Sequence, residues 1–188
     1  DTAVSDVQTD ALPNGKIGNG NLHKIFVNSD ETEVYANLAG RGAIVREVNY
    51  GSFKMLEVDE NRGVSRQELG TIGGEIRDEQ NLIPLNGYVI DTTDGKGTLD
   101  REPSDLRQSS MKEGIAKKGL YIVQFVGPVK DEWLSELNAV GGKVVTYIPN
   151  NAYVVRADAK TASELNSFRS KNFVQYVGDF EPAFRLSP

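Results

Sequence analysis

The sequence predicts an α+β protein built from two tandem units, each an antiparallel sheet with helices on one face. Apolar segments follow the order strand, helix, strand, strand, helix, strand, and this order occurs twice along the 188 residues. Within the strands both alternating sets of side chains are apolar, so one set faces the helices, and the other is expected either to dock a partner or to be buried against the other unit. The element order is that of the ferredoxin-like, split βαβ arrangement.

The second copy shows the pattern most clearly. Residues 120–126 read LYIVQFV, a run of β-branched and aromatic residues typical of a strand. A helix is expected over 130–142, because its large apolar residues, including Trp133, fall on one face and two glycines end it. Thr161 and Glu164 have the spacing of a capping box at the start of a second helix. The remaining expected elements are strands at 143–149 and 152–158, a helix at 161–170 and a last strand at 173–178.

The first copy repeats this order with a looser match. Gly42 aligns with Gly142, and Phe53 aligns with Tyr153. The agreement lies in element order and loop position rather than in residue identity, so we interpret the chain as a duplicated module. Its expected elements are strands at 24–28, 43–49 and 52–59, helices at 31–42 and 64–72, and a final segment at 75–84.

Polar segments delimit the two units. Residues 1–22 are rich in Gly, Asn, Asp and Thr and are interpreted as a leader. Residues 92–118 carry Gly, Pro, Ser and many charges, which predicts a mobile linker. The first ferredoxin-like unit is therefore placed at 23–91 and the second at 119–188, with an extended tail from Gly178 onward.

The composition disfavours several classes of function. Lys and Arg number 21 against 27 Asp and Glu, a net charge of -6, whereas nucleic acids and anionic membranes bind clustered basic residues. The absence of cysteine excludes disulfides and thiol chemistry. No apolar run approaches the roughly 20 residues of a membrane span. The polar start does not resemble a signal peptide, so an exported protein would already have lost its signal.

The sequence contains no catalytic set that can be recognised. His23 is the single histidine, and no serine or cysteine motif lies near it, whereas a triad needs nucleophile, base and orienting acid together. His23 is therefore interpreted as a surface residue. Asp91, Asp94 and Asp100 offer carboxylates on a glycine-rich run, but without the spacing of an EF-hand loop. We favour a solvated linker there, with calcium as the alternative, and expect no cofactor and no hydrolytic activity.

Three motifs of the second copy carry a resemblance to a known family. They are YIVQFVGPVKDEW from Tyr121, YIPNNAYVVR from Tyr147 and YVGDFEPAFRLSP from Tyr176. Together with RDEQNLIPLNGYVIDTT from Arg77, they resemble the N-terminal prosegment of bacterial subtilisin-like serine peptidase precursors. The resemblance is dense in the second copy and loose in the first, and it does not extend to residues 1–21.

This resemblance implies a secreted, non-catalytic module with the ferredoxin-like fold. Such prosegments help a cognate catalytic domain to fold and keep it inhibited until they are removed. Their sheet packs on helices of the catalytic domain, and their tail lies in the substrate cleft. The residues that we expect to contact the peptidase are Tyr147, Tyr153, Phe173 and Tyr176 on the sheet, and Phe180, Phe184 and Leu186 in the tail.

Other functions remain open at this point. A free-standing peptidase inhibitor of the same fold would act in trans, and the coding sequence after Pro188 would distinguish it from a prosegment. An accessory domain that binds carbohydrate or a cell surface would need exposed aromatic platforms, whereas Trp133 lies on a helix face that should be buried. A structural spacer is the plainest alternative, since a fold does not fix a function.

Overall fold

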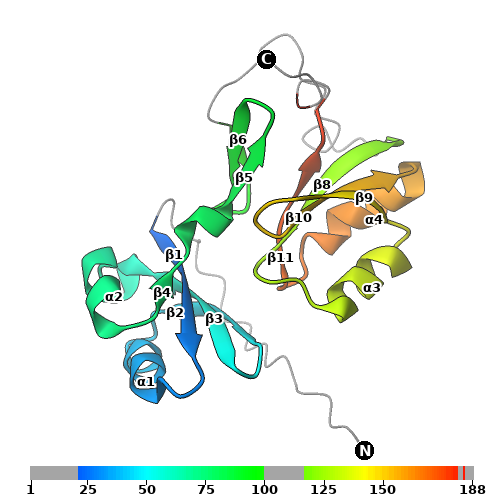
Figure 1. The fold of residues 1–188 in the computed structure, drawn as a ribbon. Helices are drawn as coiled ribbons and strands as arrows, with labels where there is room; N and C mark the ends of the chain where they lie inside the picture. Colours follow the sequence, from blue (N-terminus) through cyan, green and yellow to red (C-terminus); the bar gives the residue numbers. More distant parts are fainter. Residues whose placement is uncertain (1–20, 100–116, 182–183, 185–188) are drawn as a thin grey trace, which may run out of the picture. The chain divides into compact units, whose positions relative to one another are not determined.

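The computed structural model describes residues 21–99, 117–181 and 184 (Figure 1). Within these residues the fold combines four α-helices with antiparallel sheets, which confirms the predicted α+β class. The chain divides into two compact units, Asp1–Asp78 and Glu79–Pro188. No helix of the described residues is both long enough and apolar enough to cross a membrane.

The first unit has a four-stranded sheet in the order β2-β3-β1-β4, with neighbouring strands antiparallel. Its elements are β1 (Leu22–Asn28), α1 (Thr32–Gly40), β2 (Ile44–Asn49), β3 (Phe53–Asp59), the 3-10 helix η1 (Glu60–Arg62), α2 (Arg66–Ile72) and β4 (Glu75–Ile76). Alternate residues of β1, Ile25 and Val27, pack with Leu38 of α1 and Leu69 of α2. The two helices therefore cover one face of this sheet, as the alternation predicts.

The second unit has a four-stranded sheet in the order β11-β8-β10-β9 and a three-stranded sheet in the order β5-β6-β7. Its elements are β5 (Leu82–Leu85), β6 (Tyr88–Asp91), β7 (Thr98–Leu99), β8 (Gly119–Phe125), α3 (Asp131–Ala139), β9 (Lys143–Ile148), β10 (Ala152–Ala157), α4 (Ala159–Phe168) and β11 (Val174–Asp179). The 3-10 helix η2 (Asp78–Asn81) precedes β5 at the boundary between the units.

Helices α3 and α4 lie on one face of the four-stranded sheet (Figure 1). Phe125 of β8 packs there against Trp133 of α3, with ring centroids 5.8 Å apart. The start of α4 differs from the predicted capping box at Thr161 and Glu164. The helix begins earlier, and Asp158 caps it by accepting a hydrogen bond of 2.8 Å from Thr161 N. An aspartate at this position satisfies a backbone N–H that the helix itself leaves without a partner.

The opposite face of the same sheet is covered by the β5–β6 hairpin. Ile83 and Ile90 of the hairpin are buried with Ile122 of β8, Ile148 of β9 and Val154 of β10. The unit boundary predicted at Asp91 is therefore wrong, because this hairpin buries its apolar residues in the second unit. The predicted linker also begins too early, since β7 pairs with β6.

Candidate functional site

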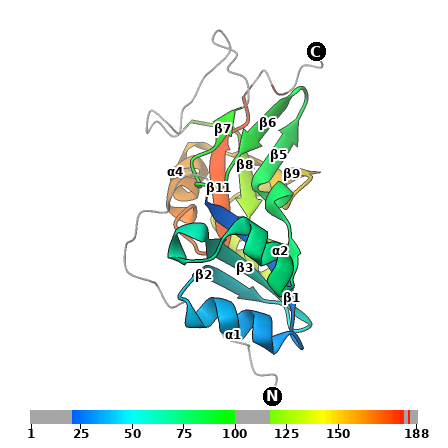
Figure 2. The same ribbon diagram turned by 90° about the vertical axis from the view of Figure 1, so that its left-hand side faces the viewer.

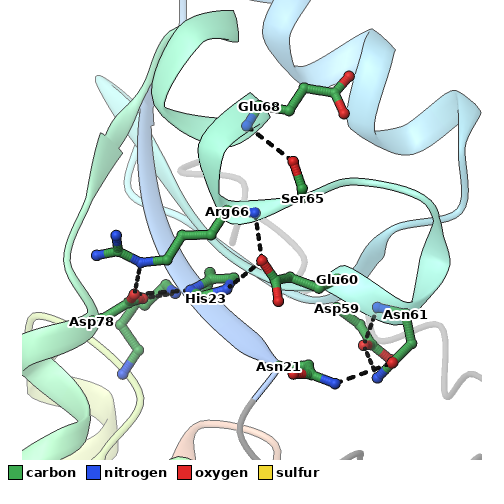
Figure 3. Close-up of polar contacts among 10 residues, drawn as sticks. Asn21, His23, Asp59, Glu60, Asn61, Ser65, Arg66, Glu68 and Asp78 are labelled. Carbon is green, nitrogen blue, oxygen red and sulfur yellow. Dashed lines mark hydrogen bonds and ion pairs between the residues drawn. The ribbon is translucent and has the colours of Figure 1, made fainter.

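The single histidine lies in a buried polar cluster of the first unit (Figure 3). His23 on β1 is 6% exposed, with its Nδ1 2.8 Å from Asp78 Oδ2 and its Nε2 3.3 Å from Glu60 Oε1. The expectation of a surface histidine is therefore wrong. The start of β1 is buried because η1 and the segment after β4 fold back over it, and each brings a carboxylate to the ring.

Asp78 is the acceptor that holds this cluster together. Its Oδ1 accepts a hydrogen bond of 3.1 Å from Lys24 N, and its Oδ2 accepts one of 3.3 Å from Arg66 Nε. The Glu60 carboxylate accepts a hydrogen bond from Arg66 N. Ser65, also drawn in Figure 3, caps α2 with its hydroxyl oxygen. The cluster thus holds the last residue of the first unit in place.

We expect His23→Ala to lower the free energy of unfolding of the first unit by about 1–3 kcal/mol, because it removes a partner of a part-buried carboxylate. Hydrogen exchange read by mass spectrometry should show faster exchange of the β1 amides. Asn21→Ala is the control, since the Asn21 side chain makes an exposed hydrogen bond to Asn61. Unchanged exchange in β1 of the His23 variant would contradict a structural role for the cluster.

The large hydrophobic side chains that are exposed in the described residues lie on two strands of the second unit, β9 and β5. They are Leu82, Val144, Val145 and Tyr147, which are 36, 41, 48 and 55% exposed. Strand β9, which carries three of them, is the outermost strand of its sheet, and β5, which carries Leu82, runs beside it (Figure 2). Because three of these residues are on β9, we take the β9 edge as the candidate contact surface.

Tyr147 and Tyr153 are the two predicted contact residues that the structure places at this edge. Their rings meet edge to face, with centroids 5.3 Å apart. Tyr153 also contacts the ring of Phe125 in the core at 6.0 Å. Burial raises the pKa of the Tyr153 phenol, and the neighbouring Tyr147 raises it further. Tyr153 is thus a half-buried anchor for the exposed ring of Tyr147.

Phe173 and Tyr176, which were also predicted to contact a peptidase, pack within the unit. Phe173 is buried and stacks on Trp133, with ring centroids 5.3 Å apart and planes 8° apart. The ring of Tyr176 lies against Gly178 and Gly97, where a Cβ atom on either glycine would overlap it. The structure thus gives Phe173 a place in the core and Tyr176 a place under the β6–β7 loop.

The two described aromatic residues of the predicted tail also pack within the second unit. Phe184 is 3% exposed, and its ring contacts Phe180 at 5.9 Å and Tyr88 of the hairpin at 5.6 Å. Phe184 is therefore buried within its own unit, whereas Phe180 is only half-buried, and its expected contact with a peptidase stays a prediction. The third predicted tail residue, Leu186, lies outside the described residues.

A network of amide groups fastens the hairpin to the sheet. Gln124 Nε2 on β8 donates to Gln80 O at 2.9 Å and to Asn150 O at 3.0 Å. Asn150 has a left-handed φ of 68°, which asparagine tolerates, and its Nδ2 donates to Glu79 O at 2.8 Å and Leu82 O at 2.7 Å. These bonds satisfy polar groups that the hairpin would otherwise bury without partners, so its position is specified.

Two of the aspartates considered as calcium ligands, Asp91 and Asp94, accept hydrogen bonds within a turn. Asp91 Oδ1 accepts hydrogen bonds from Thr93 N and Oγ1 at 2.9 and 2.6 Å, and Asp94 Oδ1 accepts one of 2.9 Å from Lys96 N. Both carboxylates thus stabilise the connection between β6 and β7. Asp100 lies outside the described residues, within which no cluster of three His, Cys, Asp or Glu residues could hold a metal ion.

The sequence analysis did not identify Val144, Val145 and Leu82 as exposed residues of a contact surface. The β5–β6 hairpin, however, has a recognisable sequence signal. Asn86 and Gly87 lie between two apolar runs, and Asn-Gly is a strong indicator of a two-residue hairpin turn. That signal predicts the pairing of β5 with β6. It does not predict that the hairpin packs on a sheet whose first strand begins at Gly119.

Comparison with known proteins gives one family match. Residues 84–181 match the family described as "Domain of unknown function (DUF8729)", a segment that runs from within β5 to just past β11. No curated protein and no solved structure was found to match the chain. The matched segment makes up more than half of the 188 residues, so the chain belongs to the DUF8729 family.

Proposed function

We propose that this chain is the prosegment of a secreted subtilisin-like serine peptidase, which it helps to fold and then temporarily inhibits. We also propose that both units have the ferredoxin-like fold. Numbered within each βαββαβ repeat, the strands lie in the order 4-1-3-2 in both units, and neighbouring strands are antiparallel. This order supports the fold that the resemblance implies.

The observation that carries the proposal is where the resembling motifs fall in the structure. The motif from Tyr121 covers most of β8 and the start of α3, the motif from Tyr147 covers the end of β9, the turn and most of β10, and the motif from Tyr176 begins within β11. The three motifs are thus successive parts of one compact unit. A module that binds only the folded form of a partner stabilises that form, which suits a folding template.

The surface that meets the peptidase differs from the one the family resemblance implies. The sheet face opposite the helices is covered by the β5–β6 hairpin, and most of this hairpin lies within the DUF8729 match. We therefore place the contact at the β9 edge, with Tyr147 as its exposed aromatic residue and Tyr153 as its support. Exposed aromatic residues of this kind are enriched among the residues that dominate binding energy.

The test measures hydrolysis of a chromogenic peptide by subtilisin in the presence of the full chain. We expect inhibition with a constant in about the micromolar range, and an increase of about tenfold or more in that constant for Tyr147→Lys. Asn138→Lys, which adds the same charge on the exposed side of α3, is the control and should inhibit like the parent chain. An unchanged rate at about 100 μM chain would contradict the proposed function.

A further inference from the structure

The tip of the β5–β6 hairpin places an asparagine directly before a glycine. Asn86 and Gly87 form a two-residue turn, because Leu85 pairs with Tyr88 across it. Both turn residues are exposed, and Gly87 has a left-handed φ of 71°, which glycine adopts readily. The turn thus holds the Asn86 carboxamide in water, next to a backbone nitrogen whose own residue has no side chain to shield it.

This arrangement exposes the Asn86 side chain to attack by the backbone that follows it. Asparagine is one of the thermolabile residues of proteins. The Gly87 nitrogen loses its proton to water and adds to Asn86 Cγ, so a C–N bond closes a five-membered succinimide ring. The Cγ–Nδ2 bond then breaks, and Nδ2 takes up a proton from water and leaves as ammonia. Water opens the ring at either carbonyl and produces aspartate or isoaspartate, so the reaction consumes only water.

The atom that would leave as ammonia is also a contact within the unit. Asn86 Nδ2 donates a hydrogen bond of 3.3 Å to Phe184 O, 98 positions along the chain. Phe184 N in turn donates to Glu181 O at 3.0 Å. An aspartate at neutral pH has no proton to donate, and its carboxylate would face the Phe184 carbonyl oxygen. Conversion to aspartate therefore replaces an attraction at Phe184 O by a repulsion.

The second product, isoaspartate, disturbs the same contact through the backbone. Its main chain runs through the former side chain, which adds one carbon atom to the turn. The turn of a hairpin fixes the register of its two strands, here Leu85 opposite Tyr88. The Tyr88 ring meets the Phe184 ring at a centroid distance of 5.6 Å. A longer turn therefore shifts the residue that packs on Phe184.

We propose that Asn86 is a site of spontaneous deamidation in the folded chain, and that this modification releases Phe184 from the hairpin. The loss of ammonia makes the change irreversible, so it acts as a slow, one-way alteration of the second unit. The proposal does not depend on the proposed function, and its test contains no peptidase.

Incubation of the full chain at mildly alkaline pH, followed by peptide mapping with mass spectrometry, tests the site. We expect Asn86 to be converted several times faster than Asn49, an exposed asparagine at the end of β2 that the bulky Tyr50 follows. Mapping separates this conversion from Asn14 and Asn19, which glycines also follow but which lie outside the described residues. Conversion should slow at mildly acidic pH, where the attacking nitrogen keeps its proton. Asn86 converted no faster than Asn49 would overturn the proposal.

Two variants test the route of the reaction. Asn86→Gln keeps a carboxamide but needs a six-membered ring, so residue 86 should keep its mass during the incubation. Gly87→Ala adds a methyl group beside the attacking nitrogen and should slow conversion of Asn86. Because alanine is strained at a φ of 71°, circular dichroism checks that this variant is folded. Conversion of the folded Asn86→Gln variant at the parent rate would contradict attack by Gly87 N.

Asn86→Asp tests the release of Phe184 directly. Hydrogen exchange of the Phe184 amide, followed by NMR, should be faster in this variant by about two- to tenfold, as expected for the loss of one hydrogen bond. Asn138→Asp, which adds the same charge on an exposed position of α3, is the control and should leave this exchange unchanged. Equal exchange of the Phe184 amide in Asn86→Asp and in the parent chain would reject the release.

Discussion

Replacing Ile83 by alanine is expected to lower the free energy of unfolding of the second unit by about 2–5 kcal/mol. Ile83 is 0% exposed and packs with Ile90 of the hairpin and Ile122 of the sheet. Truncation removes buried apolar surface and leaves a cavity where the hairpin meets the sheet. Trp133 is the only tryptophan of the chain and is buried in this unit, so its fluorescence in a urea titration follows the transition.

The neighbouring residue provides a matched control for this prediction. Leu82 is 36% exposed on the same strand, and Leu82→Ala is expected to cost less than about 1 kcal/mol. If the two alanine variants are equally stable, the hairpin does not form part of the hydrophobic core. The sheet face would then be open, and the contact surface proposed for the peptidase would have to move from the β9 edge to that face.

Phe173→Ala is expected to lower the free energy of unfolding of the second unit by about 3–5 kcal/mol. The Phe173 ring stacks on Trp133 and meets the rings of Phe125 and Phe168 at 6.3 and 5.8 Å, so its removal leaves a void among aromatic residues. Circular dichroism in urea is the suitable measurement, because the substitution itself changes the surroundings of the tryptophan.

Tyr147→Ala serves as the comparison for the Phe173 variant. Tyr147 is 55% exposed, and its truncation is expected to change stability by less than about 1 kcal/mol. The two residues were predicted from sequence to have the same role, so the experiment separates a core residue from a surface residue. Equal losses of stability would contradict the assignment of Tyr147 to an exposed contact surface.

The order of the elements could be predicted from sequence because it depends on local patterns. The run from Leu120 and the helix around Trp133 have the periodicity of a strand and an amphipathic helix, and the glycines after α3 mark its end. The start of α4 was predicted less well, because Asp158 and Thr161 are both good capping residues. The structure selects Asp158, one turn earlier than predicted.

The position of the β5–β6 hairpin could not be predicted, because it depends on contacts distant in sequence. The side chain of Gln124 donates a hydrogen bond to Gln80 O, and that of Asn150 donates one to Leu82 O, 68 positions away. No sequence pattern indicates either pair of partners. The same contacts explain the errors at the candidate site. The hairpin covers the second face of the sheet, so Phe184 is buried in a core. The exposed apolar residues therefore lie on the edge strand that carries Val145, and not on the sheet face that the sequence predicted.

The coding sequence that follows Pro188 tests the proposed function most directly. A prosegment acts on a catalytic domain of the same precursor, so the account predicts that the reading frame continues into a subtilisin-like domain carrying the aspartate, histidine and serine of a catalytic triad. A reading frame that ends after Pro188, or that continues into an unrelated domain, would contradict the proposal that this chain is a prosegment.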